Sequence, residues 1–338
     1  MNQSDIAHIK ELLSTPKNIT IVTHRNPDGD AYGSSLALYH SLKDKHNVTV
    51  ISPNDCPEFL KWLPGEDEIL IFEDDDPRNK EVLNNAEIIF TLDFNALHRT
   101  GDAMASVLEK LSPVYIMIDH HKQPDNYARY VYSDEMISST SQMIYHFLEK
   151  LGALDRIDKT VATCLYAGIV TDTASFKYQL ANALTHRIVA NLLETGIDHT
   201  EIQNNLYDTN SINRLHLLGK ALRNLRVLRE YQTAYITLSQ SELNSFAYKK
   251  GDTEGFVNYG LSLKGVIFAA IFIEDQKQQI IKISFRSKGS FCVNEFARTY
   301  FNGGGHENAA GGRSEESLKD TVTRFIKVVK LHKDKLHV

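Results

Sequence analysis

Histidine and aspartate side chains at the ends of apolar segments are the residues of this chain best suited to chemistry. His24, Asp28 and Asp30 lie in one short polar turn directly after the β-branched run Asn18–Thr23. A proline and a glycine inside that turn allow several side chains to converge. An ordinary capping turn with Asp30 as the N-cap would need only one acid and would leave the histidine and the second aspartate unexplained. The turn therefore predicts metal binding.

Further acids and histidines end other apolar segments in the same way. Asp93 follows an apolar run at 86–92, and the triplet Asp-His-His at 119–121 follows another at 114–118. Asp172 follows a third, helix-like run. Charged or imidazole groups at the ends of buried segments cost free energy unless they bind a metal or reach water. A solvated polar loop is the alternative for each one alone, but the repeated pattern favours one shared site.

Together these positions supply the ligands for two divalent cations. Hard or borderline ions accept carboxylate oxygen and imidazole nitrogen, and one carboxylate can be shared by two ions. Mixed ligands of this kind favour Mn²⁺ over zinc, which more often recruits thiolates, with Mg²⁺ or Co²⁺ as alternatives. Two ions about 3.5–4 Å apart can clamp the attacking and leaving oxygens of an in-line displacement at phosphorus. We therefore expect two Mn²⁺ per chain, held by His24, Asp28, Asp30, Asp93, His120 and Asp172.

The elements that must position these ligands are typical of an α/β domain, which we expect over residues 1–205. Strand-like runs alternate with helical patterns, and this predicts a mostly parallel sheet flanked by helices. Ligands of such sheets bind at the carboxyl ends of the strands, where the predicted metal ligands lie. The predicted strands are Asn18–Thr23, Asn47–Ile51, Ala86–Leu92 and Val114–Ile118, and the predicted helices include Ala31–Lys45, Thr140–Leu151 and Lys159–Val170.

The pattern changes in the second part of the chain. Residues 206–230 are predicted to form a helical connector, because the charged stretch Asn213–Glu230 suits an exposed helix. Residues 231–338 are predicted to form a smaller α+β domain. Its predicted strands are Tyr231–Leu238, Gly265–Ile273 and Gln279–Arg286, and its predicted helices lie near Ser239–Ala247, Cys292–Phe301 and Ser317–His332.

A glycine-rich run in this second domain is a candidate substrate site. Gly304 and Gly305 let the backbone approach a ligand and present N–H groups to a phosphate. His306 and Asn308 add side chains that form hydrogen bonds. No Gly-Lys-Ser/Thr follows, which excludes a Walker loop, and a flexible loop is the ordinary alternative. In the first domain Arg99 could reach a substrate phosphate, although a lone arginine is more often in a surface ion pair.

Composition excludes several other classes of protein. The chain of 338 residues has a net charge of −6, which argues against a long footprint on duplex nucleic acid. Its three cysteines lie far apart and predict neither a disulfide framework nor a zinc ribbon. No apolar run approaches the roughly 18 residues that cross a bilayer, and the N-terminus lacks an apolar signal core. We therefore expect a cytoplasmic protein with no membrane or duplex-DNA partner, and a homodimer is compatible with the sequence.

The motifs resemble those of the DHH phosphoesterases. The HxxxDxD turn at 24–30, the isolated Asp93, the Asp-His-His triplet at 119–121 and Asp172 are similar to motifs one to four of that family. The run Gly-Gly-Gly-His-Glu-Asn-Ala-Ala-Gly at 303–311 resembles the substrate-binding motif of the DHH-associated C-terminal domain. The motifs occur in the family's order and extend over nearly the whole chain. The resemblance implies a metal-dependent phosphoesterase.

Two further segments resemble one branch of the family. Residues 93–101, with Asp-Phe-Asn and His-Arg-Thr-Gly, and residues 255–259, Gly-Phe-Val-Asn-Tyr, are most similar to the bifunctional oligoribonuclease (nanoRNase) and PAP-phosphatase branch. That branch implies hydrolysis of short oligoribonucleotides to mononucleotides, and of adenosine 3′,5′-bisphosphate (pAp) to AMP and phosphate. Alternatives are a pApA or c-di-AMP phosphodiesterase, a longer-chain single-strand exonuclease and a catalytically silent nucleotide-binding protein. Every metal ligand of the family pattern is present, which favours an active enzyme.

The resemblance also implies roles for single residues. His121 would lie beside the scissile phosphate, where it would neutralise developing charge or protonate the leaving oxygen. Arg286 and His306 of the C-terminal domain would contact the remaining phosphate or nucleotide. One ion would be held by His24 and Asp28, the other by Asp30, His120 and Asp172, and both by the bridging Asp93.

Overall fold

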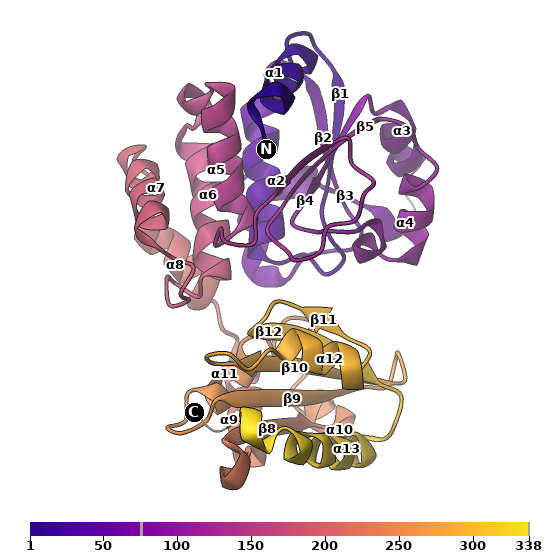
Figure 1. Cartoon of the computed structure of the whole chain (residues 1–338), viewed down its shortest axis with the longest axis vertical. Coiled ribbons are helices and arrows are strands. Elements are labelled where there is room, and N and C mark those ends of the chain that lie inside the picture. The colour runs from indigo at the N-terminus through magenta and orange to yellow at the C-terminus, as the bar shows by residue number, and fades with distance from the viewer. Residues whose placement is uncertain (75–76, 337–338) are drawn as a thin grey trace. The chain divides into compact units, whose positions relative to one another are not determined.

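Short buried strands in the first part of the chain form a parallel sheet (Figure 1). The strands are β1 (Asn18–Val22), β2 (Asn47–Ser52), β3 (Leu70–Ile71), β4 (Ile88–Leu92), β5 (Val114–Asp119) and β6 (Tyr130–Ser133). The structure is a computed structural model that describes residues 1–74 and 77–336, and within these residues the sheet has six strands in the order β3-β2-β1-β4-β5-β6. Neighbouring strands pair in parallel. The order reverses between β1 and β4, and such a switch point is where α/β sheets bind ligands.

Helices cover both faces of this sheet, and the predicted α/β architecture is confirmed. One hydrophobic core packs α1 (Gln3–Leu12), α2 (Gly29–Leu42), α5 (Thr140–Leu151) and α6 (Lys159–Asp172) against one face. A second core packs α3 (Pro77–Asn85) and α4 (Asp102–Leu108) against the other face. Along β1 the side chains alternate, because Ile19 and Ile21 enter the first core and Val22 the second. Beyond α6 lie α7 (Ala183–Glu194) and α8 (His199–Tyr207).

The chain divides into two units, Met1–Thr209 and Asn210–Val338, and the second contains a mixed sheet. Its strands are β7 (Arg226–Leu228), β8 (Thr233–Leu238), β9 (Phe268–Asp275), β10 (Ile280–Ser287), β11 (Gly304–Gly305) and β12 (Ala309–Ser314). They occur in the order β11-β12-β10-β9-β8-β7, and among these pairings only β8 with β9 is parallel in the part of the chain described. The predicted smaller α+β unit is therefore present.

Two hydrophobic cores lie on the two faces of the second sheet. Phe268, Ala270 and Phe272 of β9 face the core that also contains α12 (Val293–Tyr300) and α13 (Leu318–Leu331). The alternate residues Ala269 and Ile271 face the core with α9 (Ile212–Asn224), α10 (Gln240–Ser245) and α11 (Phe256–Leu261). No helix among the described residues is long and apolar enough to span a membrane.

The predicted exposed helix Asn213–Glu230 differs from the structure. Helix α9 ends at Asn224, and β7 then pairs antiparallel with β8. Leu217 and Ala221 on α9 are fully buried and pack with the core of the second unit. The helix is amphipathic, and its apolar residues pack against the sheet that follows it in the chain. It is therefore not an exposed connector helix. The limits 1–205, 206–230 and 231–338 stay a prediction.

Candidate functional site

The turn between β1 and α2 places His24 and Asp28 at the carboxyl edge of the first sheet. Asp28 is the N-cap of α2, because its Oδ1 accepts the backbone N–H groups of Asp30 at 3.0 Å and Ala31 at 3.1 Å. The alternative with Asp30 as the cap is therefore wrong. Nδ1 of His24 lies 3.0 Å from the carbonyl oxygen of Arg25. A proton on Nδ1 donated to that carbonyl leaves the lone pair of Nε2 for a metal.

Asp30, in the first turn of α2, is buried and held by another helix. Its Oδ2 accepts the backbone N–H of Thr140 at 2.6 Å, and its Oδ1 accepts that of Ser141 at 2.8 Å. Both donors lie in the first turn of α5, where unpaired N–H groups and the helix dipole favour an anion. The orientation of the Asp30 carboxylate is therefore set by α5.

Asp93 lies between two groups of ligand atoms. It follows β4 with a left-handed backbone (φ 66°), and its N–H donates to the carbonyl of Ile118 at 3.1 Å. Its Oδ2 is 3.4 Å from Nε2 of His24, and its Oδ1 is 3.4 Å from Nε2 of His120. Each carboxylate oxygen thus faces a different histidine, as a bridging ligand would require.

The two groups on either side of Asp93 match the sets that the family resemblance implies. In each group the ligand atoms lie within 4.8 Å of one another. His120 has its Nε2 3.8 Å from Asp30 and 3.6 Å from Asp172. The groups are His24 with Asp28 and Asp93, and Asp30 with His120 and Asp172. All of these residues belong to the first unit, and their oxygen and imidazole donors fit divalent cations.

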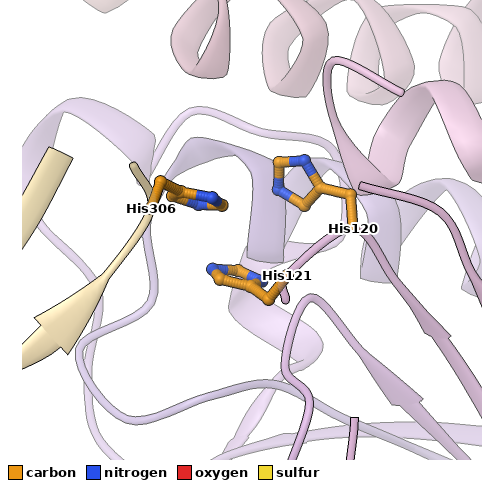
Figure 2. Close-up of side chains that lie close together, drawn as sticks. All are labelled: His120, His121 and His306. Atoms are coloured by element: carbon orange, nitrogen blue, oxygen red, sulfur yellow. The ribbon is translucent and has the colours of Figure 1, made fainter. Parts of the chain in front are cut away.

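The triplet after β5 gives its three side chains different surroundings. The rings of His120 and His121 meet edge to face, with centroids 5.0 Å apart (Figure 2). Nδ1 of His121 lies 2.6 Å from Oδ1 of Asp119, which is completely buried. This short contact keeps the Nδ1 proton toward Asp119 and directs Nε2 away from it. Asp119 is therefore a functional candidate that motif reasoning left without a role.

Electrostatics at the site favour a cation. Burial raises the pKa of Asp30 well above its usual range, and the charges of Asp93 and Asp172 add to this effect. Burial also raises the pKa of Asp172 to about 7, against the opposing charge of His120. Burial has the same tendency at Asp93, but hydrogen bonds from His120 and His24 outweigh it and hold its pKa well below the usual range. A divalent cation would relieve the repulsion between these carboxylates.

Both histidines hold protons more strongly than a free imidazole. Burial lowers the pKa of His120, but the charges of Asp172 and Asp93 reverse this and raise the pKa well above its usual value. The pKa of His24 is also raised, since Asp93 and Asp28 outweigh burial and the positive charge of Arg99. Metal binding must therefore displace protons from the site.

Close packing of two helices brings Asp172 to this site. Asp172 is the last residue of α6, which lies against α2. A Cβ added to Gly33 on α2 would lie 2.6 Å from the carbonyl oxygen of Cys164 and 2.9 Å from the Cα of Gly168. Both contacts are with the backbone of α6, so glycine is required for this approach. Asp30 and Asp172 can share a site because the two helices touch here.

Arg99, on the short helix Leu97–Thr100 that follows β4, also lies near the metal ligands. Its carbonyl accepts the N–H of Arg25 at 2.8 Å, which ties its loop to the turn that carries His24. Its Nε is buried and has no hydrogen-bond partner among the described residues. A buried guanidinium nitrogen without a partner suits an anionic ligand such as phosphate.

The predicted substrate residues of the second unit gather at one end of its sheet. Arg286 on β10 is paired with Ala309 on β12, and Ala309 accepts the backbone N–H of His306 at 2.7 Å. The amide nitrogen of Asn308 donates to Ser287 Oγ at 2.8 Å and to the carbonyl of Gly289 at 3.0 Å. Asn308 thus has a structural role in holding the end of β10.

Backbone conformation and close packing explain why glycine occurs at the positions of this motif. Gly304 and Gly305 form the edge strand β11 and pair with β12, so they are not an irregular loop. Gly305 has φ of 145°, and a Cβ there would lie 2.5 Å from the carbonyl oxygen of Ala309. The motif lets the backbone of β11 lie close to the backbone of β12, and His306 follows directly after β11.

The run Ser138–Ser141 before a helical pattern predicts an N-cap and a helix N-terminus that suits an anion, but the ligand motifs do not connect it to the metal site. Ser139 is the cap, with its Oγ accepting the N–H of Gln142. The sequence offers no sign that the next two backbone N–H groups bind Asp30, or that Thr140 Oγ1 donates to Asp93 Oδ1 at 3.0 Å. These contacts join residues about 50 to 110 positions apart, for which no local pattern exists.

Comparisons with known proteins find similar sequences over most of the chain. Residues 18–169 match the sequence model of the DHH family, N-terminal domain, and residues 231–331 match that of the DHHA1 domain. The bifunctional oligoribonuclease and PAP phosphatase NrnA of Bacillus subtilis is 30% identical over 296 residues, which cover 86% of this chain and 88% of that protein.

Two further similarities concern a longer protein and a solved structure. The cyclic-di-AMP phosphodiesterase GdpP of Bacillus subtilis is 26% identical over 95% of this chain, but the match spans only 49% of GdpP. The crystal structure of an exopolyphosphatase-related protein from Bacteroides fragilis has a TM-score of 0.94 and 40% identity, covering 99% of this chain and 98% of that one.

Proposed function

The chain belongs to the DHH family and is a phosphoester hydrolase, and from this premise we propose that it hydrolyses short oligoribonucleotides to mononucleotides and pAp to AMP and phosphate. The observation that carries the proposal is Asp93, whose two oxygens each lie 3.4 Å from a different histidine. Similarity to NrnA over most of both chains supports the choice of substrates.

His24 and Asp28 would hold one divalent cation, and Asp30, His120 and Asp172 would hold the other, with Asp93 shared between them. Mn²⁺ is our proposed ion, with Mg²⁺ or Co²⁺ as alternatives, because oxygen and imidazole donors suit all three. Such ions, when bound, would supply Lewis-acid activation of water and of the phosphoryl group. Hydrogen bonds already orient two of these ligands, since the N–H groups of Thr140 and Ser141 hold Asp30 and the carbonyl of Arg25 holds His24.

His121 is the proposed residue for proton transfer. Its Nδ1 is 2.6 Å from the buried carboxylate of Asp119, which sets the direction of the ring. Nε2 then neutralises charge on the phosphate oxygens or gives its proton to the leaving oxygen. Asp119 acts through His121 and is a positioning residue.

Three polar side chains are proposed to bind the rest of the substrate. Arg99, with its partly buried guanidinium, binds a phosphate beside the metal ligands. In the second unit Arg286 and His306 bind the remaining phosphate or nucleotide, and Gly304 and Gly305 provide close backbone approach. Asn308 supports this end of the sheet through Ser287 and Gly289.

Substrate preference tests the proposal. Mn²⁺-dependent turnover would be compared across pAp, pApA, c-di-AMP, an RNA trimer, an RNA 24-mer, pyrophosphate and tripolyphosphate. Rapid cleavage of pAp, pApA and the trimer, with little turnover of the others, is the expected result. Product analysis should give AMP and phosphate from pAp.

Other outcomes would reassign the substrate. Preference for c-di-AMP would favour a cyclic-di-AMP phosphodiesterase, the activity for which the relative GdpP is named. Preference for the 24-mer would favour a long-chain exonuclease. Preference for tripolyphosphate would point toward the description of the Bacteroides fragilis protein. A chain that binds nucleotide without any turnover would be a silent binding protein.

A further inference from the structure

We propose that Thr140 is a positioning residue that fixes Asp30 and Asp93 relative to each other, and thereby the spacing of the two candidate metal sites. This inference rests on the proposed metal-dependent function. Thr140 contacts both carboxylates, through its backbone to Asp30 and through its side chain to Asp93. Neither sequence comparison nor the ligand motifs assign it a role.

The two contacts use separate parts of one rigid residue. The backbone N–H of Thr140 donates to Oδ2 of Asp30 at 2.6 Å, and its Oγ1 donates to Oδ1 of Asp93 at 3.0 Å. Thr140 is completely buried at the first position of α5, directly after the N-cap Ser139. Its β-branched side chain has few accessible rotamers. One anchored residue therefore spans the carboxylates from both groups of ligands.

The hydroxyl matters because an aspartate carboxylate turns easily about χ2. This torsion has a broad energy profile, so hydrogen bonds decide where the two oxygens point. In Asp93 the oxygen that accepts from Thr140, Oδ1, is also the oxygen that faces His120. Holding Oδ1 there leaves Oδ2 directed toward His24. Loss of the hydroxyl would release the carboxylate proposed to bridge the ions.

Thr140→Val isolates this effect. Valine keeps the shape of the side chain and the backbone N–H that binds Asp30, and removes only the bond to Asp93. The matched control is Thr185→Val on α7: Thr185 is also fully buried and donates to Gln142 Oε1 of α5 at 2.9 Å, away from both carboxylates. Each change deletes one buried hydroxyl hydrogen bond that involves a residue of α5.

Metal binding is the main measurement. Mn²⁺ titration by calorimetry, together with electron paramagnetic resonance of the Mn²⁺ pair, would be performed on the full chain and each variant. Thr140→Val should weaken at least one Mn²⁺ by about 10- to 100-fold, the usual cost of losing a partner of a metal ligand. Its spin-coupled pair signal should also change. Thr185→Val should lose comparable thermal stability and bind Mn²⁺ like the parent chain.

A second pair of variants tests the role if valine prevents folding. Thr140→Ser and Thr140→Ala both lack the γ-methyl group and differ in the hydroxyl, so serine should retain Mn²⁺ affinity and alanine should lose it. Unchanged Mn²⁺ affinity in Thr140→Val, or equal losses in serine and alanine, would overturn the inference. A parent chain that binds no Mn²⁺ pair would instead overturn the proposed metal centre itself.

Discussion

At the scale of single residues, Asp93 combines an unusual backbone with a shared side chain. A φ of 66° is uncommon outside glycine, although aspartate and asparagine tolerate it better than most residues. Such conformations cost of order 1–3 kcal/mol and persist where surrounding contacts hold them. Here the hydrogen bond of the Asp93 N–H to Ile118 and the contacts of its carboxylate to two histidines hold it. The backbone is held in a form that suits ligand binding.

Replacement of Asp93 by alanine should abolish hydrolysis while the fold is retained. The expected loss in kcat/KM is more than about 100-fold, greater than the usual cost of losing a residue that only hydrogen-bonds to a metal ligand. Turnover of pAp and circular dichroism would measure the two effects. Asp93→Asn is the control for backbone conformation, because asparagine also tolerates a φ of 66°. Retained turnover in Asp93→Ala would remove the bridging role.

Asp119 should be needed for proton transfer but not for metal loading. Asn at this position removes the carboxylate that orients the His121 ring through Nδ1, so we expect Asp119→Asn to lower kcat by about 10²–10⁴-fold. The double variant with His121→Gln should be little worse than the worse single variant, because the pair acts as a unit. Kinetics at saturating Mn²⁺ and Mn²⁺ titration measure both properties. Additive losses would show that the residues act separately.

Metal affinity should rise with pH. The pKa values of His24 and His120 are raised, and burial raises that of Asp172 to about 7, so these groups hold protons near neutrality that a cation must displace. Between pH 6 and 8 the Mn²⁺ association constant should increase, by up to about tenfold per pH unit for each proton released. Calorimetry in two buffers of different ionisation enthalpy counts the protons. A pH-independent affinity without proton release would contradict this.

At the scale of elements, three helices position the ligands around the switch point of the sheet. The end of α6 carries Asp172, the start of α2 carries Asp28 and Asp30, and the start of α5 holds Asp30 in place. Packing of α2 on α6 depends on Gly33, where a side chain would meet α6 backbone. Small residues in these helices therefore support the candidate metal site, because they let the helices pack closely, without being ligands themselves.

Gly33→Ala should separate these helices. Its Cβ would lie 2.6 Å from the Cys164 carbonyl oxygen, and overpacking of this kind costs about 1–3 kcal/mol. Denaturant unfolding should show a lower free energy of unfolding. Mn²⁺ affinity should also fall, because the distance between Asp30 and Asp172 increases. The control is Gly219→Ala on the exposed face of α9, where a Cβ meets nothing within 4 Å. There alanine should stabilise the helix by about 0.5–1 kcal/mol. Unchanged stability in Gly33→Ala would show that the helices adjust freely.

At the scale of the whole molecule, the first unit contains the six proposed metal ligands and the second unit contains candidate substrate residues. The ligands lie within Met1–Thr209, while Arg286 and His306 lie within Asn210–Val338. A net charge of −6 agrees with a substrate that offers few phosphates. Cytoplasmic location, dimerisation and the absence of duplex-DNA binding stay predictions.

This division predicts that substrate binding and metal loading respond to different variants. His306→Ala should raise KM for pAp by about 10- to 100-fold, the cost of losing a hydrogen bond to a charged group. Mn²⁺ affinity should stay the same, since the six proposed metal ligands all lie within Met1–Thr209. The exposed His216 on α9 provides the control, and His216→Ala should alter neither property. An unchanged KM in His306→Ala would exclude this residue from substrate binding.

The sequence by itself determined the chemistry and the architecture. Ligand types after apolar runs predicted the six metal candidates, since strand ends in a parallel sheet meet at one edge. The four main strands of the first unit were predictable because their β-branched and apolar runs are local signals. Short edge strands such as β3, β6 and β7 carry too few residues for a pattern and form only because a neighbour is present.

The tertiary structure alone decided how these residues are held. Asp119 bonded to His121, Thr140 joining Asp30 to Asp93, and the left-handed backbone of Asp93 are invisible in the sequence. Helix α9, in the segment predicted to be an exposed connector, packs into the core of the second unit. Burial of Leu217 and Ala221 depends on the sheet that follows α9. Hydrogen bonds and buried surfaces between distant segments exist only after folding, so spacing along the chain cannot reveal them.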